Sequence, residues 1–215
     1  MAISDKEKDS ALEYASNELQ KDNYPVAFRI YNALADEDVP EALFEMGRFF
    51  KFGWLGEIDH HKAFEYFMKG ALLDNVLCQW LLADCFLKGE GTEKDLSKAF
   101  YWIKESADAG CPFALTDLAT YYREGIGVEQ NFEKMAECLL VLADEDSNCA
   151  SQAQNNLAFC YLKGEGVKRD VEKAKYYFLR AIESSCHYYL DKTIEGAKNG
   201  DIDDMEMLSL FGVDY

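Results

Sequence analysis

The sequence predicts an all-α fold of stacked antiparallel helix pairs, and two observations lead to it. A glycine segment recurs along the chain: Gly53, Gly89 and Gly125 are 36 residues apart, and Gly164 follows 39 later. A fixed period of this length is typical of an array whose repeats pack only on their neighbours. Before each glycine segment, apolar residues follow the spacing of one helical face. Each repeat is therefore expected to be helix, glycine turn, helix.

The first helix of each repeat is predicted from a recurring set of a large apolar, a small and a ring-bearing residue. In the last copy these are Leu157, Ala158 and Tyr161, and the small residue would let the second helix approach closely. The four stretches that carry such sets are Ala42–Lys51, Cys78–Lys88, Ala114–Glu124 and Ala153–Lys163.

The second helix of each repeat is predicted to begin after a capping residue. Asp59, Asp95, Asn131 and Asp170 follow the four glycine segments, and a lysine stands three positions after each. Asp and Asn are good N-cap residues because their side chains accept hydrogen bonds from the first turn. Gly110 fits a stop after the second of these helices. The paired glycines supply backbone freedom at a tight turn between helices.

The whole chain, 1–215, is expected to form a single repeat domain. Its predicted parts are an N-terminal helix pair over 4–39, repeats over 40–75, 76–110, 111–148 and 149–185, and a C-terminal cap over 186–215. The N-terminal pair has Pro25, which suits a helix start, in place of a glycine segment. The cap is expected to consist of capping helices. One is read over Cys186–Asn199, and the short acidic segment after it could either cap the array or fill the groove. Terminal repeats depart from the pattern because one side faces water.

Composition restricts the possible partners. The formal net charge is −18, with 40 acidic against 22 basic residues, a field that repels nucleic acid and anionic membranes and favours a basic protein. The seven cysteines form no CxxC pair, and the chain shows neither a signal peptide nor a membrane-spanning run. We therefore expect a cytoplasmic protein whose cysteines are small core residues.

The repeats resemble the Sel-one-like repeat family, a relative of the tetratricopeptide repeat. The copy that fits best has Ala153, Leu157, Ala158, Tyr161, Gly164, Gly166, Val167, Asp170, Lys173, Ala174 and Tyr177. The third repeat departs at Met135, where the family has alanine, and the first has an extra residue between Gly53 and Gly56. The resemblance implies a right-handed α/α superhelix that serves as a protein-binding scaffold. The disulfide-stapled branch of the family is not supported, because Cys78 and Cys85 would stand two turns apart on one helix.

No set of residues points to catalysis, a metal or a cofactor. Glu90 and Glu165 lie in predicted solvated turns, and the glycine segments lack the lysine pattern of a phosphate loop. His60 and His61 are neighbours that would point apart on a helix, and His187 is distant in sequence, which speaks against a histidine metal site. We therefore expect no enzyme and no cofactor; a hydrolase is the weakest alternative.

A surface is the more promising site. In a stack of the tetratricopeptide type the first helix of each repeat lines the concave side, and three positions per repeat would face it. An apolar stripe with an acidic rim suits a protein-binding groove. Partial burial by the curl of the array is the alternative. The predicted partner-binding residues are Glu41, Phe44, Arg48, Leu77, Trp80, Asp84, Phe113, Thr116, Thr120, Gln152, Asn155 and Phe159.

These observations favour a non-catalytic protein-binding module that takes a basic partner in its groove. The sharper hypothesis is a bacterial immunity-type inhibitor that occludes a toxin or effector, such as a basic nuclease. Two features of the sequence suggest this hypothesis: the compact array and the net charge of −18. The resemblance adds that small arrays of the Sel-one-like family occur beside toxins. The alternative is a regulatory adaptor that joins two partners in signalling or stress control.

Overall fold

The computed structural model describes residues 4–144, 149–185 and 187–213, and within them it contains twelve α-helices and no strand. The all-α prediction is confirmed. The chain divides into two compact units, residues 1–111 and 112–215, whose boundary lies between the second and third repeats. Each unit is described by itself.

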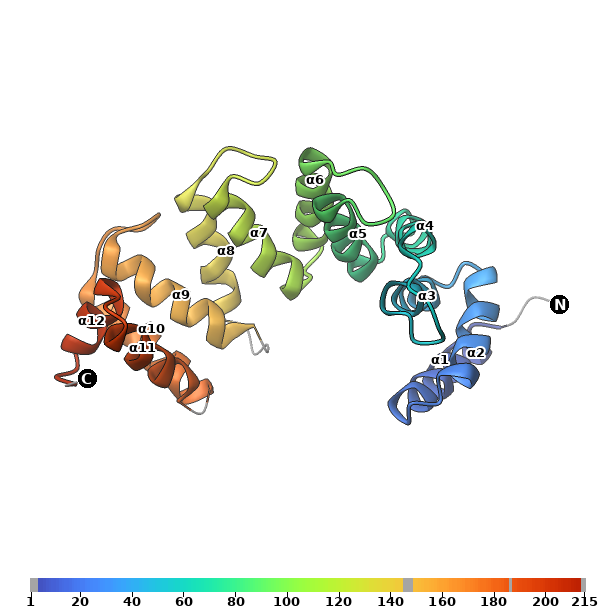
Figure 1. The fold of residues 1–215 in the computed structure, drawn as a ribbon, viewed down its shortest axis with the longest axis horizontal. Coiled ribbons are helices and arrows are strands. Elements are labelled where there is room, and N and C mark those ends of the chain that lie inside the picture. Colours follow the sequence, from blue (N-terminus) through green and yellow to red (C-terminus); the bar gives the residue numbers. More distant parts are fainter. Residues whose placement is uncertain (1–3, 145–148, 186, 214–215) are drawn as a thin grey trace. The chain divides into compact units, whose positions relative to one another are not determined.

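The first unit holds the N-terminal pair and two repeats. Each helix packs against the next along the chain, and α3 also contacts α5, the first helix of the following repeat. Figure 1 shows these helices in blue to green. They are α1 (Asp5–Gln20), α2 (Tyr24–Asp36), α3 (Pro40–Phe52), α4 (His60–Ala71), α5 (Val76–Lys88) and α6 (Leu96–Asp108).

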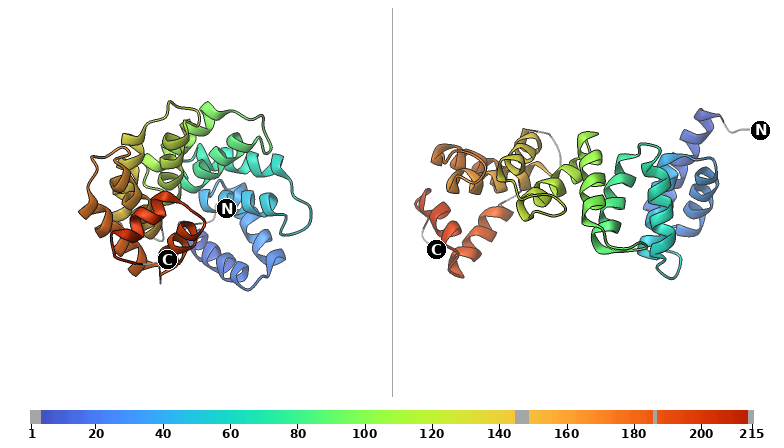
Figure 2. Two further views of the ribbon diagram at one scale, coloured as in Figure 1. Left: turned by 60° about the vertical axis from the view of Figure 1, so that its left-hand side comes forward. Right: turned by 90° about the horizontal axis from the view of Figure 1, so that it is seen from above.

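The second unit holds two repeats and the C-terminal helices, which Figure 2 shows in yellow-green to red. The helices α7 to α10 pack in chain order, α11 contacts α10, and α12 contacts both α11 and α9. They are α7 (Pro112–Glu124), α8 (Phe132–Asp144), α9 (Ala150–Lys163), α10 (Val171–Ser184), α11 (Tyr188–Lys198) and α12 (Ile202–Ser209).

The predicted capping residues begin the second helices. The carboxylate of Asp59 accepts a hydrogen bond of 3.0 Å from the Lys62 backbone N–H. Asp95, Asn131 and Asp170 repeat this bond to Lys98, Lys134 and Lys173. At the other end, Gly53, Gly89 and Gly164 cap α3, α5 and α9 in the left-handed conformation, which costs glycine no steric strain. The helix ends are therefore fixed by local chemistry.

The second glycine of each loop has a role that differs from that of the first. A Cβ atom on Gly91 would lie 2.0 Å from the backbone oxygen of His60, at the start of α4. On Gly166 it would lie 1.8 Å from the backbone oxygen of Phe132, at the start of α8. The loops of the second and fourth repeats thus rest on the second helix of the repeat before them. The first repeat replaces this contact by an aromatic one, because Trp54 stacks on Tyr24 at the start of α2, with ring centroids 5.7 Å apart.

The small residue of each first helix allows close packing, as predicted. Gly47 on α3 faces Phe67 on α4, and a Cβ atom there would lie 2.3 Å from Cε1 of that fully buried ring. The corresponding pair in the third repeat is Ala119 and Leu139, both buried. In the first repeat a glycine on the first helix thus accompanies a phenylalanine on the second, and in the third repeat an alanine accompanies a leucine, whereas the fourth repeat combines Ala158 with Phe178.

We expect Gly47→Ala to lower the free energy of unfolding by about 2 kcal/mol, because the added methyl group overpacks a filled core. Adding Phe67→Leu should restore part of this loss, since the double variant carries the pair found at Ala119 and Leu139. Chemical denaturation of the two single variants and the double variant would give a coupling energy of about 1–2 kcal/mol. Strictly additive losses would contradict the packing account.

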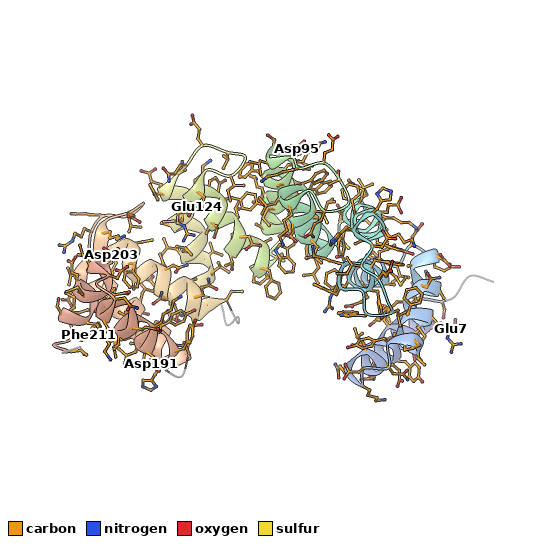
Figure 3. All side chains as sticks on the ribbon, in the orientation of Figure 1. Glu7, Asp95, Glu124, Asp191, Asp203 and Phe211 are labelled. Atoms are coloured by element: carbon orange, nitrogen blue, oxygen red, sulfur yellow. The ribbon has the colours of Figure 1, made fainter. Side chains whose placement is uncertain are left out.

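The C-terminal helices cover the end of the last repeat. Lys163, at the end of α9, forms an ion pair of 2.5 Å with Asp203, and Arg169 forms one of 2.9 Å with Glu206. Asp203 and Phe211 are labelled in Figure 3, and the Phe211 ring lies 5.8 Å from the buried Phe178 ring. The predicted capping helices are confirmed, and the second of them, α12, lies in the acidic segment, where the sequence had not located a helix. The acidic residues of the segment cap α12 and anchor it to α9 and to the loop that follows α9.

The cysteines follow the prediction of core residues with one exception. Cys78, Cys85, Cys111, Cys138 and Cys160 are buried free thiols, whereas Cys149 is half-buried. Burial raises the pKa of Cys85 to about 11 and that of Cys160 to about 11. The seventh, Cys186, lies outside the described residues. A thiol with a raised pKa is a weak nucleophile at neutral pH, which agrees with a packing role.

Candidate protein-binding surface

All twelve predicted surface positions are at least partly open to solvent. Glu41, Phe113 and Gln152 are exposed, with the Phe113 side chain 46 % exposed, and the other nine are half-buried. They lie on α3, α5, α7 and α9, the first helices of the four repeats. Whether they bind a partner stays a prediction. Among their large apolar side chains Phe113 is exposed, whereas Phe44, Leu77, Trp80 and Phe159 are half-buried.

In the second unit, four of these residues line one cavity of about 300 Å³. Thr116 and Thr120 form the α7 wall, while Gln152 and Phe159 belong to the α9 wall. Met135 and Leu139 of α8 close the floor. The Thr116 hydroxyl already donates to the Pro112 carbonyl oxygen at 2.9 Å. The cavity therefore combines an apolar floor with hydroxyl, amide and charged walls, which can contact both apolar and polar groups of a bound side chain.

The prediction missed several residues of this cavity. Arg123, Asn156, Lys163 and Glu165 also line it, whereas the predicted Asn155 does not. The Oδ1 atom of Asn155 is buried without a hydrogen-bond partner within the described residues. One signal was available in the sequence: Arg123 stands at the same repeat position as Lys51, one helical turn beyond Thr120. The three predicted positions of each helix end before that turn, so they do not include Arg123.

The equivalent space in the first unit is crossed by an ion bridge. Lys51, at the end of α3, places its Nζ 2.9 Å from Asp84 Oδ2 on α5 and 2.5 Å from Glu90 Oε2 in the following loop. Its side chain is only 10 % exposed. Lys88 approaches the other oxygen of Asp84 at 2.8 Å. This network ties the first repeat to the second across the first-helix surface.

The electrostatics of this bridge keep its members charged. Burial disfavours the Lys51 ammonium group, but its hydrogen bonds to Glu90 and Asp84 outweigh that cost and raise the pKa of Lys51. Burial likewise opposes ionisation of Asp84, yet the hydrogen bonds from Lys88 and Lys51 lower the pKa of Asp84 below its ordinary value. Both shifts favour the charged forms of Lys51 and Asp84 near neutral pH.

The second unit lacks the partner that would close its cavity in the same way. Phe159 stands at the repeat position of Asp84, so Arg123 finds no carboxylate on α9. Instead, Arg123 Nε donates to Glu124, its chain neighbour, at 2.8 Å; Glu124 is labelled at the end of α7 in Figure 3. The residue equivalent to Glu90 is Glu165, which lies 3.7 Å from Lys163. The surface therefore differs between equivalent places in the two units.

In the first unit, aromatic side chains gather near the end of α3. The Arg48 guanidinium lies 5.4 Å from the Phe44 ring centroid and 4.9 Å from that of Trp54. Trp54 in turn stacks on Phe52, whose side chain is 51 % exposed. Arg48 also pairs with Glu45 at 2.9 Å. Cation and rings thus hold one another in place, which provides a rigid apolar platform.

The described part of the chain offers neither a membrane-spanning helix nor a metal-binding cluster. Within the described part of the chain, no helix is both long and apolar enough to cross a bilayer. Nor do the residues that the structure describes gather three or more His, Cys, Asp or Glu side chains in a way that could hold a metal ion.

Comparison with known families identifies the repeats. The family model described as Sel1 repeat matches residues 40–75, 76–111, 112–139 and 151–186. A curated relative, chitin synthase regulatory factor 3 of Schizosaccharomyces pombe, is 33 % identical over 97 residues. That match covers 45 % of this chain and only 10 % of the relative.

Solved structures show the same fold. A protective antigen present in uropathogenic Escherichia coli strains, displaying an SLR fold, has a TM-score of 0.76 at 21 % identity, covering 95 % of this chain and 45 % of its own. A Sel1 repeat protein from Oxalobacter formigenes has a TM-score of 0.76 at 18 % identity, covering 93 % of this chain and 82 % of its own. At such identities the similarity establishes the fold alone.

Proposed function

Because the chain belongs to the Sel1 repeat family, we propose that it is a non-catalytic module that binds one partner protein along the first-helix surface. Repeats of this family generally serve in protein–protein interaction. The observation that carries the proposal is the solvent exposure of large apolar side chains on first helices, with Phe113 and Phe52 as its clearest members; Phe52 stacks on the half-buried Trp54 of the following loop. Rigid aromatic anchors of this kind supply most of the energy of many interfaces.

The partner is proposed to be basic, because the chain carries a formal net charge of −18. Such a field accelerates encounter with a positively charged protein.

We expect the association rate constant to fall about tenfold when the salt concentration rises from about 0.05 to about 0.5 M, since screening shortens the reach of the field. Stopped-flow association with a captured partner measures this. The dissociation rate constant serves as the control and should change little. An association rate constant that does not change with salt concentration would exclude electrostatic steering.

A finer proposal is that the partner is an enzyme which the module occludes, as a bacterial immunity protein occludes a toxin. The acidic excess would complement a basic enzyme such as a nuclease. Affinity capture with the purified chain should then return one protein at one-to-one stoichiometry, with nanomolar affinity and loss of that protein's activity in the complex. A captured enzyme that keeps its full activity while bound would contradict inhibition.

The alternative is a regulatory adaptor, and one observation favours it. The curated relative from Schizosaccharomyces pombe is named a regulatory factor of an enzyme, although this chain spans only a tenth of its length. An adaptor would return several partners of micromolar affinity, two of which bind at the same time. Simultaneous binding in analytical ultracentrifugation would support the adaptor, whereas mutual exclusion of all partners would support a single site.

A further inference from the structure

The cavity between α7, α8 and α9 carries an inference about the partner that rests on the proposed function. Its counterpart in the first unit is crossed by Lys51, which bonds Asp84 and Glu90. In the second unit the cation remains as Arg123, but the carboxylate position on α9 is occupied by Phe159. The chain therefore contains both a completed ion bridge and an equivalent place where one half of that bridge is missing.

We propose that this cavity binds an acidic side chain of the partner, adjacent in the partner's sequence to an apolar one. The carboxylate would take the place that Asp84 fills in the first unit and would bond the Arg123 guanidinium. The neighbouring apolar side chain would rest on Phe159, Leu139 and Met135. The partner thus completes in the second unit the bridge that the first unit makes within the chain.

The charges around the cavity single out Arg123 as the cation that can bind. Lys163 is already held by Asp203 at 2.5 Å and lies 3.7 Å from Glu165, so these two rim residues largely neutralise each other. Arg123 has only its exposed neighbour Glu124, through Nε, and such surface pairs contribute little. Its Nη donors make no hydrogen bond within the described residues. They can donate two parallel hydrogen bonds to a carboxylate without first breaking a hydrogen bond of their own.

The walls of the cavity suit an extended peptide. Thr120 and Asn156, on opposite walls, make no hydrogen bond with other described residues, so their polar groups can bond peptide N–H and C=O groups. At about 300 Å³ the cavity holds one or two side chains and not a folded element. The overall negative field does not prevent the binding of one acidic residue, because at physiological salt charges more than about 8 Å away are screened.

The test uses two blocked tripeptides with the full chain. Acetyl-Leu-Glu-Leu-amide carries the proposed side-chain carboxylate, and acetyl-Leu-Gln-Leu-amide has the same shape without the charge. We expect the acidic peptide to shift the NMR signals of the Asn156 side-chain amide and the Arg123 Nε–H group, and to bind about tenfold more tightly than the neutral one. Equal binding of the two peptides, or shifts confined to residues outside the cavity, would overturn the proposal.

Two variants test the residue assignments. Arg123→Gln should abolish the preference for the acidic peptide, and it is a surface change that leaves the core intact. Phe159→Asp restores the carboxylate that the first unit has at Asp84, so it should weaken acidic-peptide binding about tenfold by pairing with Arg123. Arg180→Gln on α10 is the matched control, because Arg180 lies outside the cavity and pairs with Asp144. A preference that survives Arg123→Gln overturns the assignment.

Failure of this inference and failure of the proposed function have different signatures. If the peptides do not bind at the cavity but a captured partner still requires the first-helix aromatic residues, only the carboxylate site is wrong. If the peptides bind as expected but no variant on α3 or α5 changes partner affinity, the cavity acts alone and the proposed extended surface is wrong.

Discussion

Gly91→Ala is expected to lower the free energy of unfolding of the first unit by about 3 kcal/mol or more. The new methyl group would lie 2.0 Å from the backbone oxygen of His60, and a backbone atom at the start of α4 cannot move aside as a flexible side chain could. Gly91 also has φ of +75°, a conformation that costs an L-residue roughly 1–2 kcal/mol. Chemical denaturation with far-ultraviolet circular dichroism measures the loss.

Gly110→Ala is the matched control in the same unit. Gly110 has φ of +87°, but a Cβ atom there meets nothing within 4 Å. Its loss should therefore be limited to the backbone cost of roughly 1–2 kcal/mol. The difference between the two variants isolates the contact between one repeat and the next. Equal losses would show that Gly91 serves only the conformation of its own turn.

Much of the fold follows from the sequence because it depends on local chemistry. The period of the glycine segments, the capping role of Asp59, Asp95 and Asp170, and the stop at Gly110 each concern a few adjacent residues. The contact of Gly91 with His60 does not, because a repeat pattern says nothing about which backbone atom of a neighbouring repeat lies close. For the same reason the position of α12 was not predicted: its anchors, Lys163 and Arg169, belong to the preceding repeat.

The candidate site was predicted in part. The repeat register placed Thr116, Thr120, Gln152 and Phe159 on a shared surface, and the structure puts all four around one cavity. It could not show that this place is open in the second unit and bridged in the first. That difference depends on pairs of residues from neighbouring repeats. In the first unit the pair is Lys51 and Asp84, which attract each other, and in the second unit the equivalent residues are Arg123 and Phe159, which form no ion pair.

Loss of the aromatic residues on the first helices is the second large effect that we expect. Trp80 is half-buried on α5, and Phe113 is 46 % exposed at the start of α7. Truncation of a central aromatic anchor typically costs about 2 kcal/mol or more of binding free energy. Trp80→Ala together with Phe113→Ala should therefore weaken the captured partner's affinity at least about a hundredfold.

Second-helix aromatics provide the matched control. Tyr101 on α6 and Tyr176 on α10 are 52 % and 54 % exposed, so their truncation removes a similar exposed ring without touching the first-helix surface. Both double variants should keep the wild-type circular dichroism spectrum and most of its thermal stability. A variant that unfolds is replaced by its leucine counterpart, which retains the apolar volume.

The most direct test of the binding surface is the dissociation constant of the captured partner for the wild type and these two double variants, measured by isothermal titration calorimetry. We predict at least about a hundredfold weaker binding for Trp80→Ala with Phe113→Ala, and a change below about threefold for Tyr101→Ala with Tyr176→Ala. Unchanged affinity in the first variant, or an equal loss in the second, would contradict the claim that the first helices carry the specificity of this protein.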